Sequence, residues 1–376
     1  MIRRFAPALA LLAVAACAGE EAPSPTFHAQ DNPRLLSDWG MAHVEEGALV
    51  LNDRVEPYDL ATPLFSDYAL KLRTVWTPDG KSADYHENEV FDFPVGTVIT
   101  KTFYYPMEGS AWTGAVRQVD ETGDGAPLAD GALSLEGVRL IETRLLVRRE
   151  TGWDALPYVW NEDQTDAALQ RAGALTPMTL VRANGASEPF HYAVPNANQC
   201  AGCHATDSTS KAIQPIGPKA RHLNKTSTFT PGANQLDRWR EAALLSGAPS
   251  PEAAPRNAVW TDAGASLDAR ARAYLDVNCS HCHSPSGPAD TSGLNLEPDA
   301  AGPALGACKP PIAAGRGSGG RLYSIVPGDP EASITVFRME TTDPGAMMPE
   351  LGRAVSHNEG VALIASWIAA MDGGCA

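Results

Sequence analysis

Between residues 31 and 195, apolar side chains recur mainly at every second position, which is the period of a β-strand with one buried face. Four segments show this alternation, or a concentration of β-branched and aromatic residues, most clearly: residues 67–76, 91–105, 138–149 and 153–160. In the first of these, Leu70, Leu72 and Trp76 fall on one face, and a Thr-Pro-Asp-Gly turn follows. We therefore expect an antiparallel sheet or a partly closed barrel in this part of the chain.

The pattern changes to the helical period further along the chain. Two segments carry apolar residues three and four positions apart, residues 266–278 and 357–371. The residues between them form long loops rich in Gly, Pro and Ser. The predicted fold is therefore multi-domain α+β, with a β-rich antiparallel N-terminal domain followed by an α-helical domain.

The first residues predict a targeting segment. Arg3 and Arg4 precede an apolar run, residues 5–16, that is too short to span a bilayer. The run ends in Val-Ala-Ala-Cys17, which resembles a bacterial lipobox, so residues 1–16 read as a lipoprotein signal peptide and Cys17 as the lipidation site. The alternative is an ordinary signal peptide cut near Ala16. Residues 17–30 then form a flexible tether, and we expect a periplasm-facing lipoprotein of the bacterial cell envelope, in the outer membrane.

The composition indicates which classes of partner to expect and suggests a role for each cysteine. The 376 residues carry a formal net charge of −16, which argues against nucleic acid and favours soluble or basic redox proteins. Of the seven cysteines, one is the lipidation site and four belong to the motifs described next. Cys308 and Cys375 remain, and in an oxidising compartment a disulfide between them is the simplest reading, with two free thiols as the alternative.

The strongest chemical signal is a Cys-x-x-Cys-His motif that occurs twice, as Cys200-Ala-Gly-Cys203-His204 and Cys279-Ser-His-Cys282-His283. Two thiols at this spacing reach the two vinyl groups of one porphyrin, and the following His lies under the iron. Zinc ribbons also use Cys-x-x-Cys pairs, but they do not need a His directly after each pair. The motifs therefore predict two covalently bound haem c groups, with His204 and His283 as iron ligands.

The surroundings of the second motif resemble a small class I cytochrome c domain. A helix enters the motif, a Met-Pro sequence follows in a loop, and a helix closes the chain. The resemblance implies that Met348 is the second axial ligand of this iron, with Met347 as the competing candidate. It also implies that a backbone carbonyl near Leu294, where the family usually has Pro, orients His283. A His/Met iron has no open position and suits electron transfer.

The first motif has no nearby Met, so its sixth ligand stays open. The candidates are His222, His191 and Lys101, or no ligand at all. The order of a strand containing Lys101, a Trp-containing strand and then the motif is loosely similar to the cytochrome P460 group. Members of that group have a β-sheet haem domain with an open iron, and some crosslink a Lys to the porphyrin.

Over residues 33–375 the chain resembles a family of bacterial diheme c-type cytochromes. The resemblance rests on five segments: Pro63-Leu-Phe-Ser-Asp-Tyr68, Phe91-Asp-Phe-Pro-Val-Gly-Thr97, Asn198-Gln-Cys-Ala-Gly-Cys-His204, Lys309-Pro-Pro-Ile312 and Met347-Met-Pro-Glu-Leu-Gly-Arg353. It implies a β-rich domain (residues 31–195), a haem 1 segment packed on it (196–260) and a cytochrome c-like domain with haem 2 (261–376). A parallel β-helix protein, a frequent neighbour of this family, is a candidate partner.

Three functions follow as expectations. The leading one is electron transfer between two haems and periplasmic redox proteins. The second is a diheme redox enzyme, peroxidase-like or acting on small nitrogen compounds, in which haem 1 is an open catalytic iron and haem 2 an electron relay. That reading needs an acid, base or Arg near haem 1, such as His222 or Arg221. The third is a binding module, in which the β-rich domain recognises a partner.

Overall fold

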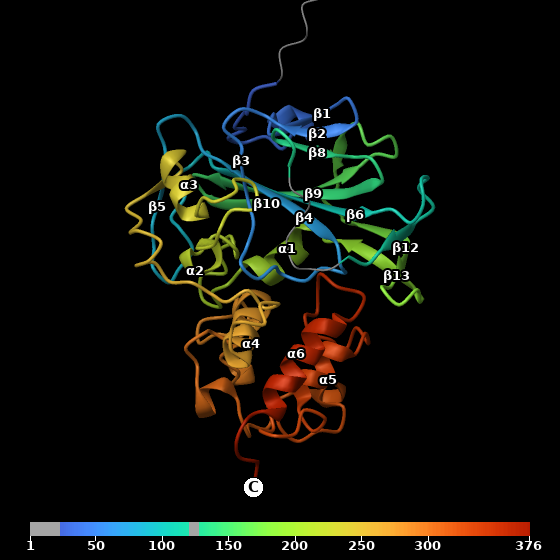
Figure 1. Cartoon of the computed structure of the whole chain (residues 1–376), viewed down its shortest axis with the longest axis vertical. Helices are drawn as coiled ribbons and strands as arrows, with labels where there is room; N and C mark the ends of the chain where they lie inside the picture. The colour runs from blue at the N-terminus through green and yellow to red at the C-terminus, as the bar shows by residue number, and fades with distance from the viewer. Residues whose placement is uncertain (1–22, 120–127) are drawn as a thin grey trace, which may run out of the picture.

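The computed structural model describes residues 23–119 and 128–376 (Figure 1). An antiparallel, β-rich region that ends near residue 194 is followed by a mostly helical region, which confirms the predicted α+β class. Cys17 and the predicted leader, residues 1–16, lie outside the described residues.

The strands of the described residues are β1 (Ala42–Glu45), β2 (Ala48–Leu51), β3 (Glu56–Tyr58), β4 (Leu70–Trp76), β5 (Ala83–Asp84), β6 (Val98–Pro106), β7 (Ala115–Arg117), β8 (Ala132–Ser134), β9 (Val138–Arg149), β10 (Gly152–Trp160), β11 (Ala167–Leu169), β12 (Ala174–Val181), β13 (Ser187–Val194) and β14 (Leu245–Ser246). The helices are α1 (Ala197–His204), α2 (Ala220–Leu223), α3 (Gln235–Glu241), α4 (Leu267–Leu275), α5 (Ile334–Glu340) and α6 (Asn358–Ala369).

A six-stranded antiparallel sheet in the order β11-β10-β9-β6-β4-β3 is the centre of the β-rich region. The sheet β1-β2-β8 lies over one of its faces (Figure 1). The core between them includes the side chains that alternation along β4 predicts, since Leu72 and Trp76 are buried there and Leu70 packs against them. The indole of Trp39 also donates a hydrogen bond to the Tyr158 hydroxyl across this core (2.8 Å).

The opposite face of the same sheet is also buried, which simple alternation did not predict. Val75 and Ile99 pack there against Leu223 and Trp239 of the short helices α2 and α3. Phe103 packs with the sheet β13-β12-β7, which contains one parallel pair, β7 with β12. Because both faces are covered, polar side chains on the second face are enclosed between the sheet and the segment that carries the first motif.

The observed boundaries follow the predictions closely where periodicity is strong. The strand predicted at residues 138–149 is confirmed as β9, and the final helix is confirmed as α6, slightly shorter than expected. The strand predicted to start at Asp67 starts instead at Leu70. Asp67 and Tyr68 have left-handed backbone angles (φ 52° and 61°), which are incompatible with a strand.

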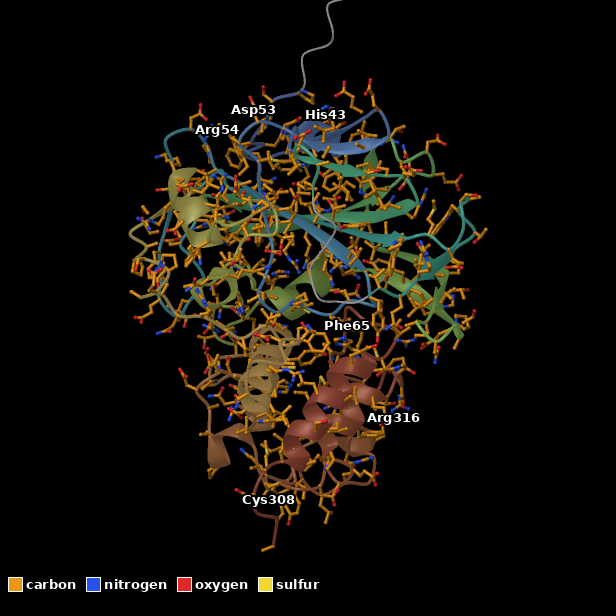
Figure 2. The ribbon with its side chains drawn as sticks, viewed as in Figure 1. His43, Asp53, Arg54, Phe65, Cys308 and Arg316 are labelled. Atoms are coloured by element: carbon orange, nitrogen blue, oxygen red, sulfur yellow. A yellow bond between two sulfur atoms is a disulfide. The ribbon has the colours of Figure 1, made fainter. Side chains whose placement is uncertain are left out.

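The C-terminal region is built around α4, α5 and α6, which share a core containing Trp260, Leu275, Ile364 and Trp367. A disulfide joins Cys308 and Cys375, whose Cα atoms are 5.2 Å apart. Figure 2 shows Cys308 near the far end of this region and Phe65 where the region meets the β-rich part. Within the described residues, no helix has the length and apolar character needed to cross a membrane.

Candidate functional site

The first motif, Cys200 to His204, occupies most of α1. The side chain of Asn196 accepts a hydrogen bond from the Gln199 amide, and the Gln199 side chain accepts one from the Asn196 amide (both 2.9 Å). This capping box starts the helix directly after β13. Since α1 packs against β10, the central sheet supports the motif.

His204 is oriented by the main chain. Its Nδ1 lies 2.7 Å from the carbonyl oxygen of Gln214. In the tautomer that donates this hydrogen bond, Nε2 carries the lone pair and can bind a metal. Burial, together with the charge of Lys101, lowers the pKa of His204 to about 3, so the ring is neutral near neutral pH. A neutral imidazole with one available nitrogen is the form that ligates iron.

The second motif, Cys279 to His283, begins at the end of α4. The helix starts at Ser266, whose hydroxyl accepts a hydrogen bond from the Ala269 amide (3.1 Å). It continues into a π-helical turn, Asp276–Ser280, that carries Cys279. Such turns are frequent at functional sites. The predicted helix entering the motif is therefore present, with a widened last turn.

His283 is held differently from His204, and differently from the expectation. Its Nδ1 lies 2.9 Å from the hydroxyl oxygen of Ser292, whereas a backbone carbonyl near Leu294 was predicted in this role. The same hydroxyl accepts a hydrogen bond from the Leu294 amide (3.3 Å). A hydroxyl has one donor and two acceptor positions, so it satisfies both groups at once. Ser292 thus replaces the predicted carbonyl.

A cavity of about 480 Å³ lies beside the second motif. Its wall includes Cys279, Cys282 and His283, and Met348 lines it as well. In the described part of the chain, the neighbouring Met347 is not part of the wall and is buried. Much of the remaining lining is apolar: Leu294, Leu296, Ile334, Met339 and Val361. The volume is in the range of cofactor-binding clefts.

The two motifs touch each other although they are distant in sequence. The Cys282 Sγ lies 4.0 Å from the Gly202 carbonyl oxygen, and the Ser208 amide donates a hydrogen bond to the Ser286 carbonyl (2.8 Å). A Cβ placed on Gly202 would lie 3.0 Å from a methyl carbon of Leu351. The absence of a side chain at Gly202 therefore lets the loop after Met348 approach the first motif.

A row of cations faces the first motif from the central sheet. Arg73, Lys101 and Arg144 are direct cross-strand partners on β4, β6 and β9. Arg144 forms a two-bond ion pair with Glu142 (2.5 and 2.9 Å), which also accepts a hydrogen bond from Tyr192 (2.7 Å). Burial and then the charges of Arg144 and Arg73 lower the pKa of Lys101 to about 7. Like charges directly opposite one another are unfavourable, and the Glu142 carboxylate offsets part of this repulsion at Arg144.

Of the three candidates for a sixth ligand, Lys101 is the one whose charge lowers the pKa of His204. His191 is exposed on β13. His222 is buried in a polar cluster, where its Nε2 lies 3.6 Å from an Asp276 carboxylate oxygen. Burial lowers the pKa of His222 to about 4 despite that carboxylate. The surroundings of the three candidates therefore differ, and His222, which the sequence favoured among them, lies in the polar cluster around Asp276.

The cluster around Asp276 connects the segment of the first motif to the helix of the second. Arg221 donates two hydrogen bonds to the Asp276 carboxylate (2.6 and 2.9 Å), and Asn257 donates a third (2.7 Å). Burial would raise the pKa of Asp276, but the hydrogen bonds and charge of Arg221 outweigh it and hold that pKa well below its usual range. Arg221, proposed from the sequence as a catalytic group, is thus engaged in an ion pair.

His281, the third residue of the second motif, was not expected from the sequence to be part of the site. This side chain lines the cavity, and its Nδ1 is buried without a hydrogen-bond partner among the described residues. Gly202 and Cys203 of the first motif line the same cavity, so His281 faces a space that both motifs share. The sequence does contain this residue as a second His inside the pentapeptide. Its place beside the first motif depends on the contact between the two motifs, which the sequence does not show.

In residues 23–119 and 128–376, no group of three or more His, Cys, Asp or Glu side chains is arranged to hold a metal ion. The four motif cysteines are outside disulfides and do not gather into the four-ligand set of a zinc ribbon. Comparisons of the chain with protein-family profiles, with curated proteins and with solved structures found no match.

Proposed function

We propose that this chain is an exported diheme c-type cytochrome that transfers electrons. Haem c would be bound through Cys200 and Cys203 at one site and through Cys279 and Cys282 at the other, with His204 and His283 as iron ligands. Haem c supplies reversible one-electron chemistry at iron. The observation that carries the proposal is that the His after each Cys-x-x-Cys pair has its Nδ1 beside an oxygen acceptor, at 2.7 Å for His204 and 2.9 Å for His283, which leaves Nε2 as the ligating nitrogen.

The residues around the second motif, here called site 2, fit a haem with two protein ligands. The cavity is mostly apolar, His283 has an oriented ring, and Met348 lines the same space. A thioether ligand favours ferrous iron and leaves no open position, which supports an electron-transfer role and a cytochrome c-like domain at residues 261–376. Met348 is therefore our proposed axial ligand, in preference to Met347.

The residues around the first motif, here called site 1, also fit a haem. A haem has two carboxylates, and the charges of Lys101 and Arg144 act on the side chains of the first motif, Cys200, Cys203 and His204. Positive charge at this place supports the binding of a group with carboxylates.

The remaining parts of the proposal concern location and partners. We propose a lipid anchor at Cys17 in the outer membrane, facing the periplasm, and periplasmic redox proteins as partners, with a neighbouring parallel β-helix protein as a further candidate. The net charge of −16 supports soluble or basic protein partners and gives no support to nucleic acid.

The decisive experiment is expression of the full chain in a host with cytochrome maturation. We expect two haems per chain in a pyridine haemochrome assay, retained on denaturing gels, and a sulfur-to-iron charge-transfer band from one of them. Protein that carries no covalent haem would refute the proposal.

The cationic row also favours the second candidate function, a redox enzyme in which site 1 binds a small anionic substrate. Lys101, whose charge acts on His204, would attract such an ion, while site 2 would relay electrons. Electron paramagnetic resonance of the oxidised protein with and without cyanide distinguishes the two functions. A high-spin iron that binds cyanide supports the enzyme, and two low-spin, inert irons support the electron carrier.

A further inference from the structure

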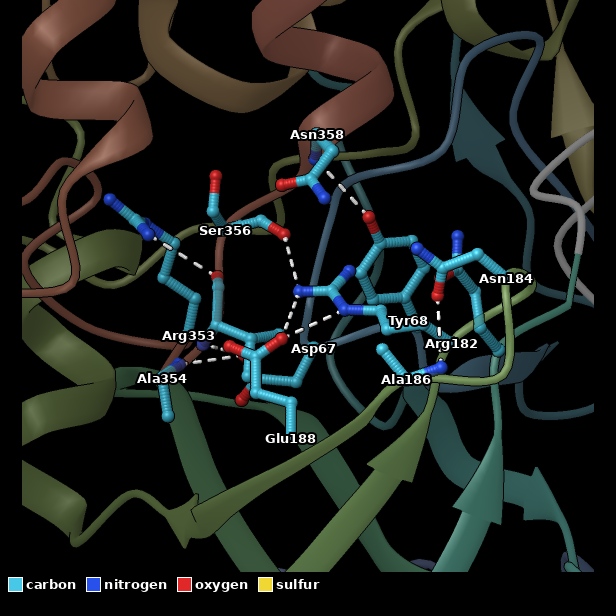
Figure 3. A network of polar contacts seen from close by, with 12 residues as sticks. Asp67, Tyr68, Arg182, Asn184, Ala186, Glu188, Arg353, Ala354, Ser356 and Asn358 are labelled. Atoms are coloured by element: carbon cyan, nitrogen blue, oxygen red, sulfur yellow. Dashed lines mark hydrogen bonds and ion pairs between the residues drawn. The ribbon is translucent and has the colours of Figure 1, made fainter.

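The loop between β3 and β4 forms hydrogen bonds with the segment that follows Met348. Figure 3 shows this network, in which Asp67 and Tyr68 come from the β-rich region and residues 353–358 from the C-terminal region. The carboxylate of Asp67 accepts hydrogen bonds from the amides of Ala354 (2.6 Å) and Val355 (3.0 Å). Asp67 is 3% exposed, so water does not compete effectively for these amides.

Tyr68 holds the start of α6. Its hydroxyl donates a hydrogen bond to the Glu359 carboxylate (2.5 Å) and accepts one from the Asn358 amide (3.2 Å). The guanidinium of Arg182 lies 4.9 Å from the centre of the Tyr68 ring and donates a hydrogen bond to the Ser356 carbonyl (3.4 Å). Three residues of the β-rich region therefore contact the stretch between residues 354 and 359.

The backbone of Asp67 and Tyr68 is itself strained. Asp67 and Tyr68 are consecutive non-glycine residues with positive φ, a conformation that residues other than glycine rarely adopt. The Tyr105 hydroxyl donates to the Asp67 carbonyl (2.8 Å) and helps to hold this conformation from β6. Strain that the surrounding structure maintains points to a functional constraint.

Arg353 connects this hydrogen-bonded network to Met348. The Arg353 side chain donates hydrogen bonds to the carbonyl of Met348 (3.0 Å) and to the carbonyls of Arg338 (2.9 Å) and Thr341 (2.8 Å) at the end of α5. The Met348 amide in turn donates to the Arg338 carbonyl (2.8 Å). Both backbone groups of Met348 are thus fixed, and the next residue after Arg353 is the one that Asp67 holds.

We propose that Asp67 and Tyr68 are positioning residues for Met348, so that the β-rich region sets the axial ligation and the potential of site 2. This inference rests on the proposed haem at site 2 and adds a control exerted from the other region of the chain. The alternative is that the network only joins the two regions mechanically. That alternative predicts a change in stability without a change in the iron spectrum.

The test uses the full-length haem-loaded protein and the variants Asp67→Ala, Tyr68→Phe and Asp67→Asn. We expect Asp67→Ala to weaken or abolish the sulfur-to-iron band and to lower the midpoint potential of one haem. We expect Tyr68→Phe, which keeps the ring and loses the hydroxyl, to produce a smaller shift of the same potential. Asp67→Asn keeps an oxygen that accepts from both amides, so it should retain the native band.

Thr102→Val is the matched control, because it removes a buried hydrogen bond to Thr143 (2.8 Å) within the sheet and leaves the loop intact. It should lower stability and leave both potentials unchanged. Native band and potentials in both Asp67→Ala and Tyr68→Phe would overturn the inference. If Asp67→Ala does not fold, Tyr68→Phe alone decides. Failure of the proposed function is distinct, because native protein would then lack covalent haem or the band.

Discussion

The two Cys-x-x-Cys-His sites share a pentapeptide but rest on different kinds of structure. Site 1 is a short helix laid on a sheet, with its His held by the Gln214 carbonyl and a row of cations opposite. Site 2 is the end of a helix beside an apolar cavity, with its His held by the Ser292 hydroxyl and a Met in the wall. The same pentapeptide therefore lies in surroundings of different charge and polarity, and under the proposed function those surroundings would decide the second iron ligand at each site.

We expect the largest effects from removing the cysteine pair of each site in turn. We expect Cys279→Ala with Cys282→Ala to halve the haem content and to abolish the sulfur-to-iron band. Cys200→Ala with Cys203→Ala should also halve the haem content but keep the band, because Met348 lies in the wall of the cavity at site 2. Pyridine haemochrome and optical spectra measure both effects. A band that survives loss of Cys279 and Cys282 would assign the sulfur ligand to site 1.

Arg221→Met breaks the connection between the two sites. It leaves the Asp276 carboxylate buried without its two strongest hydrogen bonds, so we expect a loss of about 3–5 kcal/mol in the free energy of unfolding. Because the pKa of Asp276 is depressed in the folded chain, the stabilisation is complete above pH about 4 and is lost as the pH falls below it.

Denaturant unfolding at several pH values measures this loss, and the gap between native and variant protein should narrow under acid conditions. Arg240→Met is the control, because its ion pair with Asp237 is exposed and should contribute less than about 1 kcal/mol. Equal losses in the two variants would contradict the assigned importance of the buried pair.

Removal of the disulfide should affect site 2 more than site 1. Cys308 and Cys375 are separated by 67 positions, for which the chain-entropy model gives up to about 4 kcal/mol. Both residues lie in the C-terminal region, so Cys308→Ala with Cys375→Ala should lower the melting temperature of the site 2 band while the far-ultraviolet signal of the sheet melts later. Simultaneous melting of both signals would show that the regions unfold as one unit.

The smallest expected effect concerns the cations of site 1. Below pH about 7, where Lys101 is protonated, Lys101→Gln removes one positive charge and should lower the potential of that haem by on the order of 1 kcal/mol, or about 40 mV for one electron. The other potential should stay constant, and Lys81→Gln, at an exposed turn, should change neither. A changed spin state in Lys101→Gln would instead identify Lys101 as the sixth ligand.

Local patterns predicted much of the fold, while the attachment of haem stays a prediction. Period-two and helical patterns located β9, α4 and α6, because each buries one face over many residues. The register that aligns Arg73, Lys101 and Arg144 could not be predicted, because it depends on pairing between distant strands. For the same reason the sequence did not reveal His281 between the motifs, or Asp67 as a partner of residues 354 and 355. Ser292 was missed because a side chain took the role of a carbonyl.

The close packing of the two motifs has a consequence for the timing of assembly. Cys200 is 7% exposed, Leu351 covers Gly202, and the sulfur of Cys282 faces the helix of the first motif. A maturation enzyme needs an open stretch of chain to bring porphyrin vinyl groups to both thiols of a pair. If the motifs bind haem as proposed, attachment must precede closure of the two regions, and a chain that closed first could no longer take up its haem groups.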